Sequence, residues 1–175
     1  MTPTAIAEEM RAACDDFHAL LDHAGRSELR QGSNGTRWTN EQLLFHMLFG
    51  YLLVRNLLWL VRAFSRLPDE ASRAFAAALN AATRPFHVVN YLGSLGGPYL
   101  LGRSGMARVM DHVTASLTSF MERSEAQRLE RGMHFPTGWD PYFHDYMTVQ
   151  DVLHYATVHY QHHRRQLTLR EAQNS

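Results

Sequence analysis

The sequence predicts an all-α protein in which four long helices form one bundle. Apolar residues recur at three- and four-residue intervals over four long segments, and this is the period of an amphipathic helix. No segment shows the sustained alternation of a half-buried strand. With 175 residues and a single cysteine, Cys14, the chain is expected to form one domain, residues 1–175, around an apolar core without disulfides.

The four helices are separated by recognisable start and stop signals. In chain order they are expected at residues 4–24, 39–66, 104–132 and 148–173. Thr39 stands three residues before Gln42, and Thr148 stands three residues before Asp151. Each pair can form a capping box, in which the two side chains satisfy the first free backbone N–H groups of a helix.

Residues 67–103 form a long middle connection. Its alanine-rich part, residues 69–83, has a helical composition, whereas residues 91–98 contain three glycines and a proline and are expected to be irregular. A connection of this length can cross the bundle, which lets the second and third helices run parallel. The expected topology is therefore up-down-down-up, with the second and fourth helices as antiparallel neighbours.

Charge and cysteine content argue against several classes of partner. Lysine plus arginine balance aspartate plus glutamate at 17 each, so no excess positive field attracts nucleic acid or anionic lipid. Cys14 is expected to pack as a small apolar residue, and the beginning of the sequence lacks the basic and apolar pattern of an export signal. We therefore expect a cytoplasmic protein with no nucleic-acid and no membrane partner.

The second helix is apolar on nearly all sides, and two explanations compete. Residues 43–61 approach the length of a membrane span, but Arg55 and Asn56 lie in the middle and would be costly in hydrocarbon. Burial on two sides explains the same composition. The second side, which includes Trp59, is then covered either by the middle connection as an internal lid or by a second copy of the chain.

Histidine is the residue type that stands out, with 11 copies. On a wheel at 100° per residue, His163 and His159 lie about 40° and 80° from the apolar centre of the fourth helix, on the same side. His154 and His162 lie about 140° away, towards solvent. The inward pair is spaced i, i+4, so both imidazoles can reach one metal ion at about 2.0–2.1 Å.

His46 on the second helix is the candidate for a third ligand. It lies roughly 10 Å along the axis after Thr39, and His163 lies roughly 14 Å before the expected end of the fourth helix near Gln173, so antiparallel neighbours bring the two side chains level. The sequence thus predicts a divalent-metal site formed by His46, His159 and His163, with zinc or nickel as the expected ion. Three imidazoles leave one coordination position open for water or a substrate atom.

Two motifs resemble those of the DinB-like superfamily of metal-binding four-helix bundles. One is Trp38-Thr39, which begins eight residues before His46, and the other is the run His-Tyr-Gln-His-His-Arg at 159–164 followed by Gln166. The resemblance covers most of the chain. It implies the up-down-down-up bundle, a homodimer, and a relation to metal-dependent transferases and isomerases that act with small thiols.

The resemblance also implies which residues bind the metal. The ligands in that family are one histidine of the second helix and the first and last histidines of the run, which correspond to His46, His159 and His163. Arg165 departs from the pattern, because many relatives have glycine there. This difference concerns the outer surface of the helix and leaves the metal site intact.

Two hypotheses about function follow from these observations. The first is a metal-dependent enzyme, of transferase, isomerase or hydrolase type, that activates a small thiol or water. The alternative is a non-catalytic module that binds a metal or small ligand, as in a stress response. Tyr160, Gln42 and Asp151 are conceivable supporting groups near the metal, but no motif identifies a catalytic residue.

Overall fold

The computed structural model describes residues 1–169, and within them the chain forms seven helices and two short strands. The elements are α1 (Pro3–His23), α2 (Arg26–Leu29), α3 (Asn40–Phe64), α4 (Asp69–Ala81), α5 (Thr83–Glu122), α6 (Ala126–Leu129), β1 (Gly132–His134), β2 (Tyr146–Thr148) and α7 (Val149–Arg164). The strands pair antiparallel over three residues each. Helices dominate, which confirms the all-α class.

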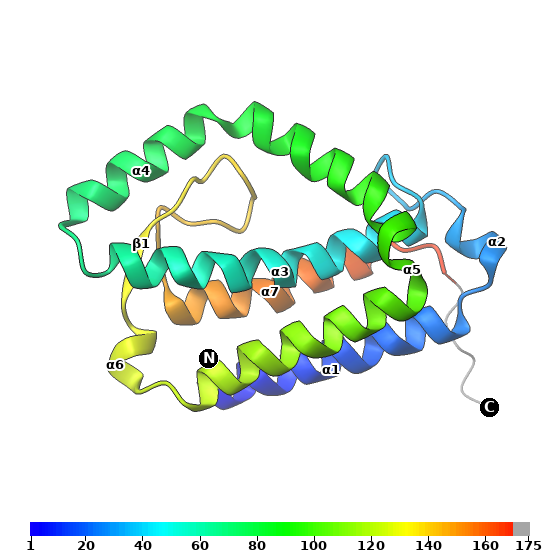
Figure 1. Cartoon of the computed structure of the whole chain (residues 1–175), viewed down its shortest axis with the longest axis horizontal. Helices are drawn as coiled ribbons and strands as arrows, with labels where there is room; N and C mark the ends of the chain where they lie inside the picture. The colour runs from blue at the N-terminus through cyan, green and yellow to red at the C-terminus, as the bar shows by residue number, and fades with distance from the viewer. Residues whose placement is uncertain (170–175) are drawn as a thin grey trace.

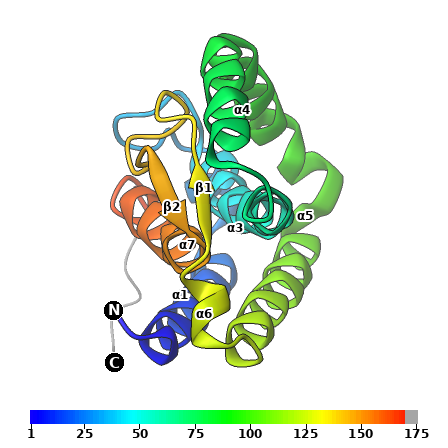
Figure 2. The same ribbon diagram turned by 90° about the vertical axis from the view of Figure 1, so that its left-hand side faces the viewer.

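Four long helical segments surround a common core (Figure 2). They are α1, α3, the second half of α5 and α7. The helix α3 packs against α5 and α7, and α1 packs against the same two helices. In Figure 1, α1 and α7 run in one direction, and α3 and the second half of α5 run in the other. The largest side chains that this packing buries completely include Phe17, Tyr51 and Tyr160.

Both predicted capping boxes are present, and they fix where α3 and α7 begin. The Thr39 hydroxyl accepts a hydrogen bond from the Gln42 backbone N–H at 3.4 Å, and the Thr39 N–H donates to the Gln42 side chain at 3.0 Å. Thr148 and Asp151 exchange the equivalent bonds at 3.1 and 2.9 Å. These local signals set the register of the two helices that carry the candidate histidines.

The middle segment differs from its expected form, because residues 91–98 are helical. They belong to the first half of α5, which ends in a kink at Gly102, where φ is 62°. Packing explains the difference: Gly97 is buried so closely against α3 that a Cβ atom at this position would lie 2.3 Å from the Phe45 ring. Contact with α3 thus outweighs the low helix propensity of glycine and proline.

The arrangement of α4 and the first half of α5 shapes the region above α3. Together they form an arch over α3, and the loop between β1 and β2 lies beneath this arch (Figure 1). The Trp139 indole N–H of that loop donates to the Leu79 carbonyl at 2.9 Å, and the Trp139 ring stacks on Phe86 at 3.9 Å. The loop is therefore fastened to the arch.

Two helix ends and the short strands also differ from expectation. The third predicted helix stops at Glu122 instead of Gly132, which begins β1. The fourth stops at Arg164, nine residues before the expected end, and Gln173 lies outside the described residues. The sequence does not predict the two strands, because three residues are too few to show the two-residue period of a strand.

Among the residues that the structure describes, α3 is the one helix whose length and apolar composition would allow it to cross a membrane. In its most apolar window, however, 61% of the residues are buried inside the protein. Burial of this kind is typical of a core helix, which agrees with burial on two sides.

Candidate metal centre

The structure brings His46, His159 and His163 together. His46 lies in the second turn of α3, and the two others lie one turn apart near the end of α7. Their candidate ligand nitrogens all lie within 4.8 Å of one another. The ring centroids of His46 and His159 are 4.9 Å apart, and those of His163 lie 4.6 Å from each of the other two rings.

Two side chains hold the His46 ring in place. The Trp38 ring packs on it with centroids 4.4 Å apart, which explains why a tryptophan just before the Thr39 cap belongs with a histidine eight residues later. On its other side, His46 Nδ1 lies 3.2 Å from the Ser94 hydroxyl of the arch. The first half of α5 therefore contributes directly to the site.

The position of His159 depends on a close approach to α3. A Cβ atom at Gly50 would lie only 2.4 Å from His159 Nδ1, so any other residue at position 50 would collide with the ring. His159 is buried, and its Nδ1 has no hydrogen-bond partner within residues 1–169. A buried nitrogen without a hydrogen-bond partner is energetically costly. A catalytic role or a bound ion explains why such an atom occurs in a native protein.

The hydrogen bonds of the other two histidines determine which nitrogen is free. His163 Nδ1 is 2.6 Å from Gln166 Oε1, and His46 Nδ1 is engaged with Ser94. Histidines that bind a metal usually donate their second ring N–H to a protein acceptor. With Nδ1 used in this way, Nε2 of His46 and of His163 is left as the donor atom.

All three imidazoles are uncharged at neutral pH. Burial, reinforced by the neighbouring histidines, lowers the pKa of His46 to about 3 and holds the pKa of His159 well below the usual imidazole value. Burial also lowers the pKa of His163. Because only neutral imidazole binds metal, three neutral rings around one point fit a divalent cation of the zinc class.

A hollow lies beside the histidines, under the arch. His46 and His159 line it together with aromatic residues of α3, α5 and the loop, including Phe49, Phe86 and Trp139. Asp140 is the carboxylate that shares this hollow. Its side chain accepts hydrogen bonds from the Tyr155 hydroxyl at 2.8 Å and from the Tyr142 N–H at 2.9 Å, so its position is fixed. No sequence motif identifies Asp140, because its place beside the histidines depends on how the loop folds.

Comparison with known families now adds an independent observation. The profile of the DinB superfamily matches residues 9–167. The chain belongs to the DinB superfamily. No curated protein and no solved structure matches it. Metal binding by a helical protein fits both the superfamily and the histidine cluster, and the matched range contains all three histidines.

In this DinB chain, the other residues of the run at 159–164 and Gln166 form contacts within the protein. His162 lies outside the cluster, and its Nδ1 is 2.9 Å from the Tyr142 hydroxyl. Arg164 donates to Asp16 of α1 at 2.9 Å, and Gln166 accepts from His163. The run thus joins the histidine cluster to α1 and to the loop between β1 and β2. Arg165 is exposed, as expected.

The three side chains considered as supporting groups have other partners. The Tyr160 hydroxyl donates to Asp16 at 2.7 Å. Gln42 and Asp151 complete the two capping boxes. Instead, Ser94 contacts His46 and Gln166 contacts His163, and Asp140 lines the hollow beside His46 and His159.

A second group of potential ligands in the DinB chain consists of Cys14, His18 and Asp111. Asp111 Oδ1 lies 2.6 Å from His18 Nε2 and 3.5 Å from Cys14 Sγ. Burial raises the pKa of the Cys14 thiol to about 11, which keeps it protonated. A protonated thiol is a poor ligand, so this group reads as a hydrogen-bonded contact between α1 and α5.

Proposed function

We propose that this protein is a divalent-metal-dependent enzyme, built as an up-down-down-up four-helix bundle, that activates a small thiol for transfer to a second substrate. In this proposal His46, His159 and His163 are the metal ligands, with zinc or nickel as the ion. One observation carries it: three neutral imidazoles lie together, and two of them, those of His46 and His159, line a hollow that also holds a carboxylate.

The donor set supports an open site. The cluster contains three nitrogen donors among the described residues, whereas closed structural zinc sites have four protein ligands. A divalent ion held there would act as a Lewis acid and lower the pKa of a thiol or water in the open position. The opposed directions of α1 and α7 against α3 and the second half of α5 support the bundle topology.

Asp140 is the proposed proton acceptor. Its carboxylate shares the hollow with His46 and His159, and the Tyr155 hydroxyl holds it by a hydrogen bond of 2.8 Å. In the proposed step the S–H bond of the thiol breaks, the proton goes to Asp140, and the sulfur keeps the electron pair. Phe49, Phe86 and Trp139 exclude water and offer an apolar surface to the second substrate.

The small size of the hollow favours activation of a small group such as a thiol or water. It also supports a second candidate function, a non-catalytic binding module. The volume of the hollow is about 30 Å³, which corresponds to one water molecule. A thiol sulfur or a water fits such a space, while a larger substrate has to enter from outside. The same small size favours the alternative of a non-catalytic module that holds a metal or small ligand without turnover.

The test begins with metal analysis of protein purified without a histidine tag. The metal-loaded protein is then screened with small thiols and electrophilic acceptors, and separately with hydrolysable esters and amides. We expect thiol-dependent turnover that requires the metal and falls sharply in Asp140→Asn, while His112→Asn, an exposed histidine on α5, serves as the matched surface control. Turnover of the hydrolysable substrates alone would reassign the activated group to water. Full metal occupancy without any turnover would favour the binding module.

We also propose that the protein is a cytoplasmic homodimer. Trp59 on α3 is 70% exposed, and Tyr99 and Leu100 on α5 are 85% and 86% exposed, which is more apolar surface than a monomer usually leaves in water. The arch covers another part of α3 as an internal lid, and the exposed part around Trp59 is the proposed dimer contact. Light scattering on wild type, Trp59→Glu and Leu100→Glu tests the dimer. A wild-type mass of one chain would refute it.

A further inference from the structure

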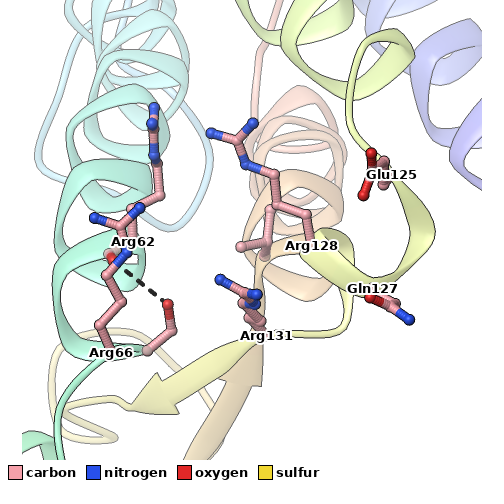
Figure 3. Close-up of a pocket in the computed structure, with 8 residues that line it drawn as sticks. Arg62, Arg66, Glu125, Gln127, Arg128 and Arg131 are labelled. Carbon is pink, nitrogen blue, oxygen red and sulfur yellow. Dashed lines mark hydrogen bonds between the residues drawn. The ribbon is translucent and has the colours of Figure 1, made fainter.

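A second hollow lies at the opposite end of α3 from the histidines, and arginines line it. Its volume is about 370 Å³, within the range of small-ligand pockets. Arg62 and Arg66 come from the end of α3 and the turn after it, Arg128 comes from α6, and Arg131 immediately precedes β1 (Figure 3). His46 and Arg62 are sixteen residues apart on one helix, or about 24 Å. The two sites are therefore separate.

The four guanidinium groups have no acidic partners. Within residues 1–169 the arginines that form ion pairs with acids lie elsewhere, and none of these four takes part. Glu125 is the acidic residue that lines the hollow, and it forms no ion pair with them. Figure 3 shows Arg62 and Arg66 on one wall and Arg128 and Arg131 on the other, so the two pairs face each other across the hollow. Four positive charges thus share the lining with the single negative charge of Glu125, which leaves a net charge of +3 (4 − 1).

Aromatic contacts hold two of these side chains in position. The guanidinium of Arg62 lies over the Trp59 ring at 5.4 Å, and that of Arg128 lies over the Phe120 ring at 5.1 Å. A guanidinium that stacks by its face keeps its N–H groups, which point outward from its edge, available for an acceptor. Such preorganisation lowers the entropy cost of binding a ligand.

A structural explanation covers only part of the cluster. The negative end of the α3 dipole favours cations at Arg62 and Arg66. It does not account for Arg128 and Arg131, which come from other elements. A generally basic surface does not account for them either, because the sequence contains no lysine, its cations are 17 arginines, and its net charge is zero.

We propose that this hollow binds a compact soluble anion that carries at least two negative charges on phosphoryl groups. A single guanidinium matches the oxygen spacing of a phosphoryl group and binds it through two parallel hydrogen bonds. Together with Glu125, the four guanidiniums give the lining a net charge of +3 (4 − 1), which offsets most of the charge of a diphosphate, and the volume suits a small compound. The proposal does not depend on the metal centre.

Isothermal titration calorimetry with inorganic pyrophosphate tests this site on the full chain. Because pyrophosphate also chelates metal ions, the titration is performed on metal-free protein and repeated on His163→Ala. We expect binding in both. Since each charge-assisted contact contributes about 10-fold or more, Arg66→Gln with Arg131→Gln should weaken binding at least about 100-fold. Both arginines are exposed, so the double variant should fold.

Two further variants make the result decisive. Arg84→Gln, which removes an exposed arginine outside the hollow, should bind as wild type does. Arg66→Lys with Arg131→Lys keeps the charge but loses the paired hydrogen bonds, so it should fall between wild type and the glutamine variant. Equal binding by wild type and the glutamine variant, or binding that is lost only in His163→Ala, would overturn the proposal.

The class and the source of the anion are tested in parallel arms. Succinate carries two carboxylates and should bind more weakly than pyrophosphate, whereas tighter binding would overturn the phosphoryl class. Phosphoryl groups also occur on lipid headgroups, so flotation with vesicles that contain phosphatidylinositol phosphate tests that source. Pyrophosphate binding without flotation supports a soluble ligand. Flotation that the double glutamine variant abolishes would overturn it in favour of a headgroup.

Discussion

Each end of α3 carries a cluster of nitrogen-bearing side chains, and the two clusters differ in burial and charge. Near its start, His46 and His159 are buried, His163 is half-buried, and all three are neutral, because burial lowers the pKa of His46 to about 3 and also lowers the pKa of His159 and of His163. Beyond its end, Arg66 and Arg131 remain exposed. Guanidinium cannot lose its proton near neutral pH, so a cluster of arginines has to stay in contact with water or with an anion.

This difference decides what each cluster can bind. Neutral imidazoles offer lone pairs to a cation and cost little to bury once their second nitrogen has a partner, as in the bond from His163 to Gln166. Guanidiniums offer only donors and positive charge. The histidine end is therefore suited to a metal cation, and the arginine end to an anion.

The largest expected effect breaks the histidine end. His163→Ala removes one of three proposed ligands, and its metal affinity should fall by more than about 100-fold, because loss of a mere supporting contact already costs about 10–100-fold. His162→Ala is the matched control, since His162 contacts Tyr142 and lies outside the cluster. Metal analysis after equilibrium dialysis measures both variants. Full occupancy in His163→Ala, or loss in His162→Ala alone, would contradict the ligand assignment.

The next effect tests the packing that lets α3 and α7 approach. In Gly50→Ala the new methyl group would lie 2.4 Å from His159 Nδ1, so the ring must move. We expect a loss of about 1–3 kcal/mol in the free energy of unfolding, together with weaker metal binding. Chemical denaturation and dialysis provide the two readouts.

Gly93→Ala is the control for this substitution. A Cβ at Gly93 meets no atom within 4 Å, and the residue lies inside α5. Because alanine favours a helix more than glycine does, this variant should gain about 0.5–1 kcal/mol. If Gly50→Ala were as stable as Gly93→Ala, the close approach of α3 and α7 would be wrong.

Local signals made much of this region predictable from the sequence. The capping residues Thr39 and Thr148 act within one helical turn, and the i, i+4 spacing of His159 and His163 fixes a common face whatever the rest of the chain does. The family resemblance supplied the same three histidines. The caps and the His159–His163 pair depend on residues close in sequence, whereas the placement of His46 beside them followed from the expected packing of the second helix against the fourth.

Long-range contacts account for what the sequence did not reveal. The helical form of residues 91–98 depends on Phe45, which packs where Gly97 leaves room. Asp140 joins the histidines only because Trp139 fastens its loop to the arch. The arginine cluster draws on three separate elements, and a balanced net charge concealed it.

Protons and the metal ion compete for the same histidine nitrogens, so metal occupancy should depend on pH. Since folding lowers the pKa of all three from the usual 6.5, the neutral form that binds metal persists below that pH. Metal occupancy should be complete at neutral pH. It should decline only when the pH falls below 6.5 and approaches the lowered pKa values of the histidines. Dialysis against buffers of decreasing pH, followed by metal analysis, gives the midpoint. Release centred above pH 6.5 would contradict neutral, buried ligands.

The smallest expected effect concerns the arginine end and has the opposite sign to the others. In chloride buffer of low ionic strength, without phosphoryl compounds, Arg62, Arg66, Arg128 and Arg131 repel one another. Arg131 lies outside α3, so the dipole of that helix does not favour its charge, and Arg131→Gln should therefore stabilise the protein by about 0.2–1 kcal/mol, as for other exposed charge pairs. The gain should shrink as added sodium chloride screens the charges. Thermal unfolding at low and high salt measures it, with Arg84→Gln as the control. Pyrophosphate should reverse the order, because it stabilises wild type more than the variant. If Arg131→Gln were less stable than wild type at low salt, Arg131 would make a favourable contact, and the mutual repulsion of the four arginines would be contradicted.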